Sequence, residues 1–292
     1  MSASAPNLFD ILLHTYDELG QLVNGVATGG SSTTLVDSGL AGKDGDWKQG
    51  TLFIKYDGAG AGAAPEGEFT EVTAYTRTAG TVTFASSTLS ASPASTDEYA
   101  LASKQWTLDD MKRIVNRALV RMGDIQAVDT SLTTAAGQTE YTIPAAARRN
   151  LRRVYMDQYS DSDDARPREL VNWRVEGNSL IFRDQPESGK TLTLLYMGPH
   201  AVLQDYNDTL STYVHLNRIV AEAAYMALKS KVRATEGTDR QAVRDINDAA
   251  ADLEIARRQY PIWDPGTPFK PILSGKRDED RRSGKYGPYY QG

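Results

Sequence analysis

Four stretches of the chain carry apolar residues at intervals of three and four, the spacing that gives a helix one buried face. They are Asn7–Asn24, Trp106–Met122 and two successive stretches within Asp208–Tyr260. Gly237 is expected to end the first of the last pair, because glycine adopts the left-handed turn after a helix without strain, and Pro261 ends the second. Two amphipathic helices joined so closely are predicted to fold back as an antiparallel hairpin.

Between these helices the pattern changes to the alternation of short strands. The predicted strands are Thr33–Asp37, Thr51–Tyr56, Phe69–Thr76, Thr81–Ala85, Glu98–Ala102, Glu140–Ile143, Asn150–Gln158, Glu169–Glu176, Ser179–Arg183 and Thr191–Tyr196. Gly177–Asn178 lies between two strand-like runs and predicts a short hairpin. The strands therefore indicate two antiparallel β regions.

The order of these elements predicts an α+β fold: a four-helix bundle core with two antiparallel β insertions and an extended C-terminal arm. Long insertions between helices are tolerated because the entropy of loop closure grows slowly with loop length. The expected segments are 1–30 for the first bundle helix, 31–105 for the first β insertion, 106–125 for the second helix, 126–207 for the second β insertion, 208–260 for the helical hairpin and 261–292 for the arm.

Composition narrows the class of protein. A chain of 292 residues can bury a core without covalent staples, and the absence of cysteine excludes disulfides and cysteine-based zinc sites. The net charge of −6 argues against a general nucleic-acid binder, which normally has a basic face. No apolar run approaches the ~20 residues of a membrane span, so no membrane partner is expected. The N-terminal residues also lack the pattern of a signal peptide.

The sequence carries no recognisable catalytic signature. His14, His200 and His215 lie far apart, and no metalloprotease, serine-hydrolase or phosphate-loop motif is present. Ser160–Arg166 contains three aspartates, but it lacks the glycine and distant glutamate of an EF-hand, so a solvated loop is preferred over a calcium site. We therefore expect no enzyme activity, no cofactor and no metal site, as in a structural or interaction protein.

A basic ridge is predicted on the helix Trp106–Met122. Arg113, Arg117 and Arg121 are spaced four residues apart and so lie on one side of the helix. Two interpretations stay open: a solvated face balanced by the upstream aspartates, or a contact with another subunit or an acidic partner.

The residues after Pro261 differ in character from the rest. Ile262–Leu273 contains three prolines and is expected to be extended, while Ser274–Gly292 has too little apolar surface to order itself. The segment is either a frayed tail or an arm that docks on a neighbour. Its candidate anchors are large apolar or aromatic side chains: Ile262, Trp263, Phe269, Ile272, Tyr286, Tyr289 and Tyr290.

Three regions carry a resemblance to a known family. They are TGGSSTTLVDSGL with DWKQGTLFI (Thr28–Leu40 and Asp46–Ile54), QTEYTIPAAARRNLRRVYMDQ (Gln138–Gln158) and NWRVEGNSLIFRDQPESGKTLTLLYMGPH (Asn172–His200). Together with the final helix pair and the arm, they resemble the head-to-tail adaptor proteins of tailed bacteriophages, also called connector or head-completion proteins. The likeness covers most of the chain as a pattern of strands and turns. The β regions exceed those of the smallest, nearly all-helical adaptors.

The resemblance implies a structural virion protein at the neck between capsid and tail, assembled in the host cytoplasm. In the family, copies form a ring, a dodecamer, that binds the portal protein and offers its far side to a tail or stopper protein. DNA passes through the ring without specific binding, and an acidic channel wall would suit that passage because phosphate contacts dominate DNA affinity. The family's C-terminal extension clasps the portal, which implies the same role for Ile262–Gly292.

Other classes of function remain open. The chain is alternatively a tail-completion component, or a receptor- or glycan-binding module of a virion that uses Trp47, Trp106 and Trp173. An unrecognised enzyme would require a deep pocket lined by carboxylates with shifted pKa values. Binding to a portal, binding to glycans and the presence of such a pocket distinguish these classes.

Overall fold

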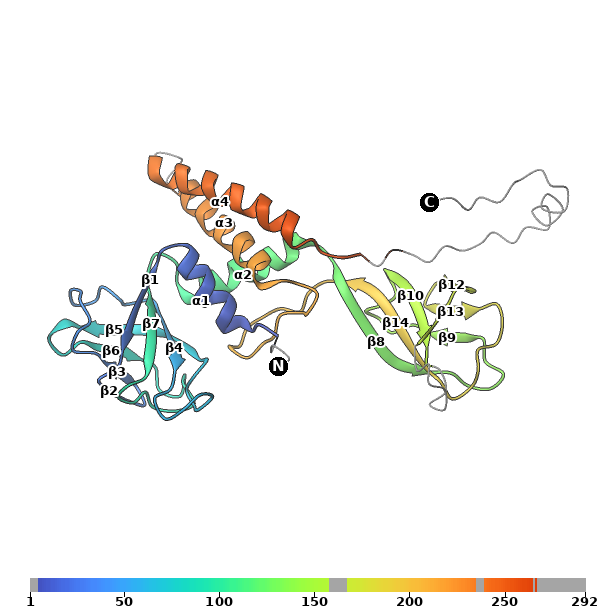
Figure 1. Ribbon diagram of the computed structural model, residues 1–292, viewed down its shortest axis with the longest axis horizontal. Coiled ribbons are helices and arrows are strands. Elements are labelled where there is room, and N and C mark those ends of the chain that lie inside the picture. Colours follow the sequence, from blue (N-terminus) through green and yellow to red (C-terminus); the bar gives the residue numbers. More distant parts are fainter. Residues whose placement is uncertain (1–4, 158–166, 235–238, 265, 267–292) are drawn as a thin grey trace. The chain divides into compact units, whose positions relative to one another are not determined.

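The structure, a computed structural model, describes residues 5–157, 167–234, 239–264 and 266. These residues form two compact units (Figure 1). The first unit combines the described parts of Met1–Ile125 and Pro199–Trp263, and the second is built from those of Gln126–Gly198 with Asp264 and Gly266. The first unit is thus assembled from two stretches that are distant in sequence.

The expected four-helix bundle core is wrong. The described chain is mostly β, with fourteen strands in three antiparallel sheets and four α-helices. The core that the helices share includes the strand residues Phe53, Phe69 and Ala100, and it contains no residue of the fourth helix. Because three of the four helices share their apolar core with strands, the β structure is a framework of the fold rather than an insertion.

Seven strands of the first unit form one sheet in the order β1-β7-β4-β5-β6-β3-β2. Their bounds, with one short 3₁₀ turn, are β1 (Leu22–Val26), β2 (Gly29–Ser31), β3 (Thr34–Val36), β4 (Thr51–Tyr56), β5 (Phe69–Thr76), η1 (Arg77–Ala79), β6 (Thr81–Phe84) and β7 (Glu98–Ala102). β1 and β2, at opposite ends of this order, follow each other in the chain. Between them the Ala27 N–H donates to the Asp97 carbonyl (2.8 Å) and the Thr28 N–H donates to the Val36 carbonyl (2.7 Å). One bent strand therefore closes the sheet into a barrel.

Alternate residues of the barrel strands face two different cores. On β4, Leu52 and Ile54 belong to the core inside the barrel, whereas Phe53 belongs to the core shared with the helices. On β7, Leu101 and Ala100 divide in the same way. Burial on both faces explains why β4 is apolar over consecutive positions instead of alternating with polar residues.

The helix α1 (Leu8–Glu18) is shorter than predicted. Its start is closed by a capping box, in which the Asn7 side chain accepts from the Asp10 N–H and the Asp10 carboxylate accepts from the Asn7 N–H. Gly20 has a φ of 62° and ends the helical path, so the prediction of a helix to Asn24 is wrong. The following residues instead form β1, whose backbone groups pair with β7.

The other helices are α2 (Leu108–Met122), α3 (Leu216–Ala234) and α4 (Arg240–Gln259). α1, α2 and α4 all pack on α3, and α3 and α4 lie side by side as the predicted hairpin (Figure 1). The His215 ring before α3 stacks on the Tyr260 ring after α4, with centroids 3.8 Å apart. α3 begins at Leu216, later than predicted, and Asp239 caps α4. Gly237 lies outside the described residues.

The second unit contains two small antiparallel sheets, ordered β11-β10-β14-β8 and β12-β13-β9. Their strands are β8 (Ile125–Thr133), β9 (Glu140–Thr142), β10 (Leu151–Met156), β11 (Arg168–Leu170), β12 (Trp173–Glu176), β13 (Ser179–Phe182) and β14 (Thr191–Gly198). One core, which includes Val154, Leu180 and Leu194, is shared between them. The hairpin predicted at Gly177–Asn178 is confirmed, since β12 and β13 pair directly across it.

Candidate interaction surfaces

The predicted arginine ridge is divided in the structure. Arg113 lies on the exposed side of α2 and forms an ion pair with Asp110 one turn earlier. Arg117 is exposed and has no ion-pair partner among the described residues. Arg121 instead turns toward α3, where its Nη1 lies 3.4 Å from the Glu222 carboxylate. Arg113 and Arg117 therefore face solvent, while Arg121 is held by Glu222 within the chain.

Glu222 is the centre of an ion-pair network among three helices. Its side chain is 1% exposed, and its carboxylate contacts Arg121 of α2 and Arg257 of α4, the latter at 3.1 Å. Arg257 also lies 3.6 Å from Glu254 on its own helix. Because a buried carboxylate without cations is costly, these contacts fix the relative positions of α2, α3 and α4.

Arg218 lies one turn before Glu222 and is 9% exposed. Its Nε and Nη1 atoms have no hydrogen-bond partner among the described residues. Burial lowers the pKa of its guanidinium; Glu222 opposes this shift and Arg257 adds to it. No prediction from the sequence included this network, although Arg218 and Glu222, spaced four residues apart among apolar residues, are a signal for it.

The start of the predicted arm is partly described. Ile262 packs against the helical core, whereas Trp263 is 59% exposed. The stacked pair His215–Tyr260 holds the chain just before this point. The remaining candidate anchors lie outside the described residues: Phe269, Ile272, Tyr286, Tyr289 and Tyr290.

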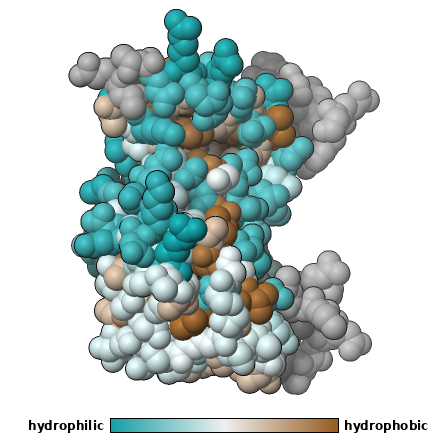
Figure 2. Space-filling view, turned by 90° about the vertical axis from the view of Figure 1, so that its left-hand side faces the viewer, coloured by the Kyte–Doolittle hydropathy of each residue, from teal (hydrophilic) through white to brown (hydrophobic). Residues whose placement is uncertain are grey.

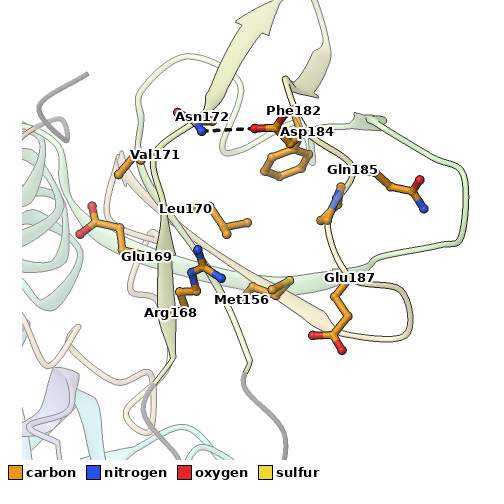
Figure 3. A pocket seen from close by; sticks show the side chains of 11 residues that line it. Met156, Arg168, Glu169, Leu170, Val171, Asn172, Phe182, Asp184, Gln185 and Glu187 are labelled. Carbon is orange, nitrogen blue, oxygen red and sulfur yellow. Dashed lines mark hydrogen bonds between the residues drawn. The ribbon is translucent and has the colours of Figure 1, made fainter. Parts of the chain in front are cut away.

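The second unit has a cavity of about 250 Å³ between β11 and the turn that follows β13 (Figure 3). Apolar side chains such as Met156 and Phe182 form part of its wall, and Asn172 donates to Asp184 at its rim (3.4 Å). Three carboxylates, those of Glu169, Asp184 and Glu187, also belong to its lining, whereas histidine, hydroxyl and lysine side chains do not occur among the described lining residues.

The histidines considered as catalytic or metal-binding candidates show no sign of either role in the described residues. His14 is exposed. His200 Nε2 accepts from the Ser211 N–H (2.9 Å), and its Nδ1–H donates to the Ala201 carbonyl (2.7 Å). Across the described part of the chain, no three potential metal-ligating side chains come together. The aspartates of Ser160–Arg166 lie outside it.

The tryptophans considered for glycan binding are not exposed platforms. Trp106 and Trp173 are buried, and Trp47 packs against the barrel core. Figure 2 shows one face of the molecule, on which hydrophilic residues dominate the upper, helical part and hydrophobic residues form small separate patches. None of the helices that the structure describes has both the length and the apolar character of a membrane span.

No protein-family model matches the chain, and no curated protein matches it. What the structure itself shows is a mostly β protein with a helical layer and charged, exposed helix faces.

Proposed function

We propose that the protein is a structural component of a phage virion, which forms a ring between the capsid portal and the tail and continues the DNA channel. The observation that carries the proposal is the resemblance of three regions to head-to-tail adaptor proteins. Two of the quoted segments, Thr28–Leu40 and Asp46–Ile54, contain strands of the barrel, and Asn172–His200 contains β12, β13 and β14.

The exposed charges of the helical layer support a role in assembly. Arg113 and Arg117 stand on α2 beside Val120, which is 77% exposed, so this helix offers both charge and apolar area to another protein. The glycan-binding alternative has less support, because the tryptophans on which it depended pack within the fold.

Co-sedimentation with the portal ring encoded beside this chain, followed by electron microscopy, tests the proposal. We expect a ring of this protein stacked on the portal, and the image also gives its copy number. Absence of any association would overturn the portal-binding role and make glycan binding the next assay.

The C-terminal residues are the proposed portal-binding segment. We expect deletion of Ser274–Gly292 to abolish co-sedimentation while leaving the thermal transitions of the protein unchanged. Replacing the three aromatic anchors Tyr286, Tyr289 and Tyr290 by alanine should reproduce the loss. The matched control is Arg281→Ala with Arg282→Ala, which removes nearby charge only. Undiminished binding by the truncated chain would refute the assignment.

A further inference from the structure

The exposed face of α2 carries an ordered set of charges. Asp109, Arg113, Arg117 and Val120 follow one another at intervals of four, four and three residues, so all four lie on one side of the helix. Each of them is exposed in the structure. The pair between Arg113 and Asp110 is itself solvent-exposed, and such pairs contribute little, so it can be exchanged for another partner. We call this set the α2 face.

The exposed face of α4 carries the same spacing with the charges reversed. Arg244, Asp248, Asp252 and Ile255 also follow at intervals of four, four and three residues, and all are exposed. Within the described residues none of these charged side chains forms an ion pair. We call this set the α4 face.

A parallel alignment of the two faces matches every position. It sets the basic residues of each face against the acidic residues of the other and places the two aliphatic side chains together. The pairs are Asp109–Arg244, Arg113–Asp248, Arg117–Asp252 and Val120–Ile255. The antiparallel alignment instead sets Val120 against Arg244 and Asp109 against Ile255. The antiparallel alignment still pairs Arg113 with Asp252 and Arg117 with Asp248 but loses both end pairs, so the pattern favours the parallel direction.

Both faces belong to the same chain, and all eight side chains are exposed, so each face is open to another molecule. We infer that the α2 face of one copy docks in parallel on the α4 face of a second copy. The contact uses two different surfaces, so each copy of a pair still has one free face, the α4 face on the first and the α2 face on the second. Such a heterologous contact generates a closed ring when the rotation between copies closes, and a filament otherwise.

This inference rests on the proposed function only in that it supplies the contact by which copies join in the ring. Its partner is a second copy of this chain, selected by charge complementarity, and not the portal. The main energetic role of the charges is to set register and exclude wrong pairings, while the aliphatic pair adds apolar burial at the end of the contact.

Charge reversal tests the contact in the full-length protein. One variant combines Arg113→Glu with Arg117→Glu, and the other combines Asp248→Arg with Asp252→Arg. Each variant alone should self-associate about tenfold more weakly than the wild type, because like charges then face each other in both pairs. An equimolar mixture should recover association, since the acidic α2 face of one variant meets the basic α4 face of the other. Sedimentation velocity at low salt measures this.

A matched control carries Arg174→Glu with Arg183→Glu, which makes the same change in charge on exposed positions of the second unit. It should behave as the wild type. Equal weakening by the control, or no recovery on mixing, would overturn the inference.

Cross-linking tests the register, and the natural absence of cysteine makes the readout clean. Under mild oxidation, a mixture of the single variants Val120→Cys and Ile255→Cys should give a mixed disulfide dimer, and the double variant should give a ladder of higher species. Val202→Cys, at a position 65% exposed elsewhere in the first unit, measures random collision. A mixed-dimer yield no higher than that of this control, in the free protein and on the portal, would refute the contact.

The two ideas fail separately. A ring on the portal without the cross-link between positions 120 and 255 would remove the helix contact and keep the proposed function. The cross-link without portal binding would keep the contact and remove the proposed function.

Discussion

The two units of this protein bury their strands in different ways. In the first unit the bent strand β1–β2 closes the barrel, and the helices cover one outer face of it. In the second unit two open sheets share one core, and β8, β11, β9 and β12 are left as the ends of those sheets. Closure removes unpaired strand edges, so we expect the first unit to be the rigid framework and the second to be the more adaptable one.

The largest expected effect on stability comes from replacing one buried phenylalanine in each unit by alanine. Phe53 is fully buried, and its ring lies within 6.0 Å of three aromatic ring centroids, those of Phe9, Tyr16 and Phe69. Phe182 in the second unit has one such neighbour, Tyr141. Phe53→Ala should lower the free energy of unfolding by about 3–5 kcal/mol, and Phe182→Ala by less, because fewer contacts are lost.

Calorimetry measures both, and each variant should lower only the transition of its own unit. A single transition that both variants shift equally would contradict the separation of the two cores.

A smaller effect is expected from the buried ion pairs of the first unit. Glu222→Gln removes the buried carboxylate that compensates the half-exposed Arg121 and Arg257 and the buried Arg218, which should cost roughly 3 kcal/mol. The matched change in the second unit is Glu176→Gln, which removes the partner of Arg174 in an exposed pair and should cost about 0.5 kcal/mol or less. Urea denaturation measures the difference, and equal costs would show that burial of the network has no energetic role.

Alkaline pH offers a third comparison. Burial raises the pKa of Tyr16 to about 12; the hydrogen bond with Thr51 opposes this shift, and the charge of Asp110 adds to it. The tyrosine therefore stays protonated in the folded state while the unfolded chain ionises near its ordinary pKa of about 10. This pKa difference stabilises the folded state by about 2–3 kcal/mol. The stabilisation is complete below pH ~10 and is lost as the pH rises from ~10 to ~12.

Tyr16→Phe should remove that part of the pH dependence, as measured by urea denaturation from pH 8 to 12. At neutral pH the variant loses the hydrogen bond to the Trp106 carbonyl (2.9 Å), worth about 1 kcal/mol. An unchanged alkaline slope would contradict the assignment.

The smallest effect concerns closure of the barrel itself. Gly25 on β1 lies opposite Tyr99 on β7, and a Cβ at this glycine would lie 2.5 Å from the Tyr99 hydroxyl oxygen. Gly25→Ala should therefore destabilise the first unit by about 1–3 kcal/mol. Gly29→Ala, on the same bent strand, meets nothing within 4 Å and should have little effect. Thermal denaturation of both variants tests this, and equal stability would show that β1 shifts freely at the closure.

The sequence was sufficient for local elements and insufficient for their assembly. Apolar spacing predicted α2 and α4, and glycine with asparagine predicted the hairpin after β12, because these signals lie within a few residues. The pairing of β1 with β7 joins residues distant in sequence, so no local pattern indicates it, and the predicted helix wrongly includes Leu22–Asn24, the first part of β1. The consecutive apolar residues of β4 are a signal of burial on both faces that the bundle prediction did not use.

The interaction surfaces were predictable to a similar degree. Helical spacing placed Arg113, Arg117 and Arg121 together, yet only the packing of α3 shows that Arg121 is bound by Glu222. The network at Glu222 depends on three helices meeting, and its members are spread from α2 to α4. For the arm, the structure describes Ile262 and Trp263 alone among its candidate anchors, so the sequence remains the basis for the others.

The discontinuity of the first unit has a consequence for synthesis on the ribosome. The Leu8 N–H donates to the Asp208 carbonyl (2.9 Å), and the Leu210 N–H donates to the Pro6 carbonyl (2.7 Å). Phe9 and Tyr16 of α1 cover Phe53 early, but the faces of α1 and α2 that pack on α3 stay uncovered until α3 is made, and Gln126–Gly198 emerges in the meantime. At about 5–20 residues per second this interval is on the order of ten seconds. During it the nascent chain displays an uncovered apolar surface, a natural place for a chaperone to bind before the last helices arrive.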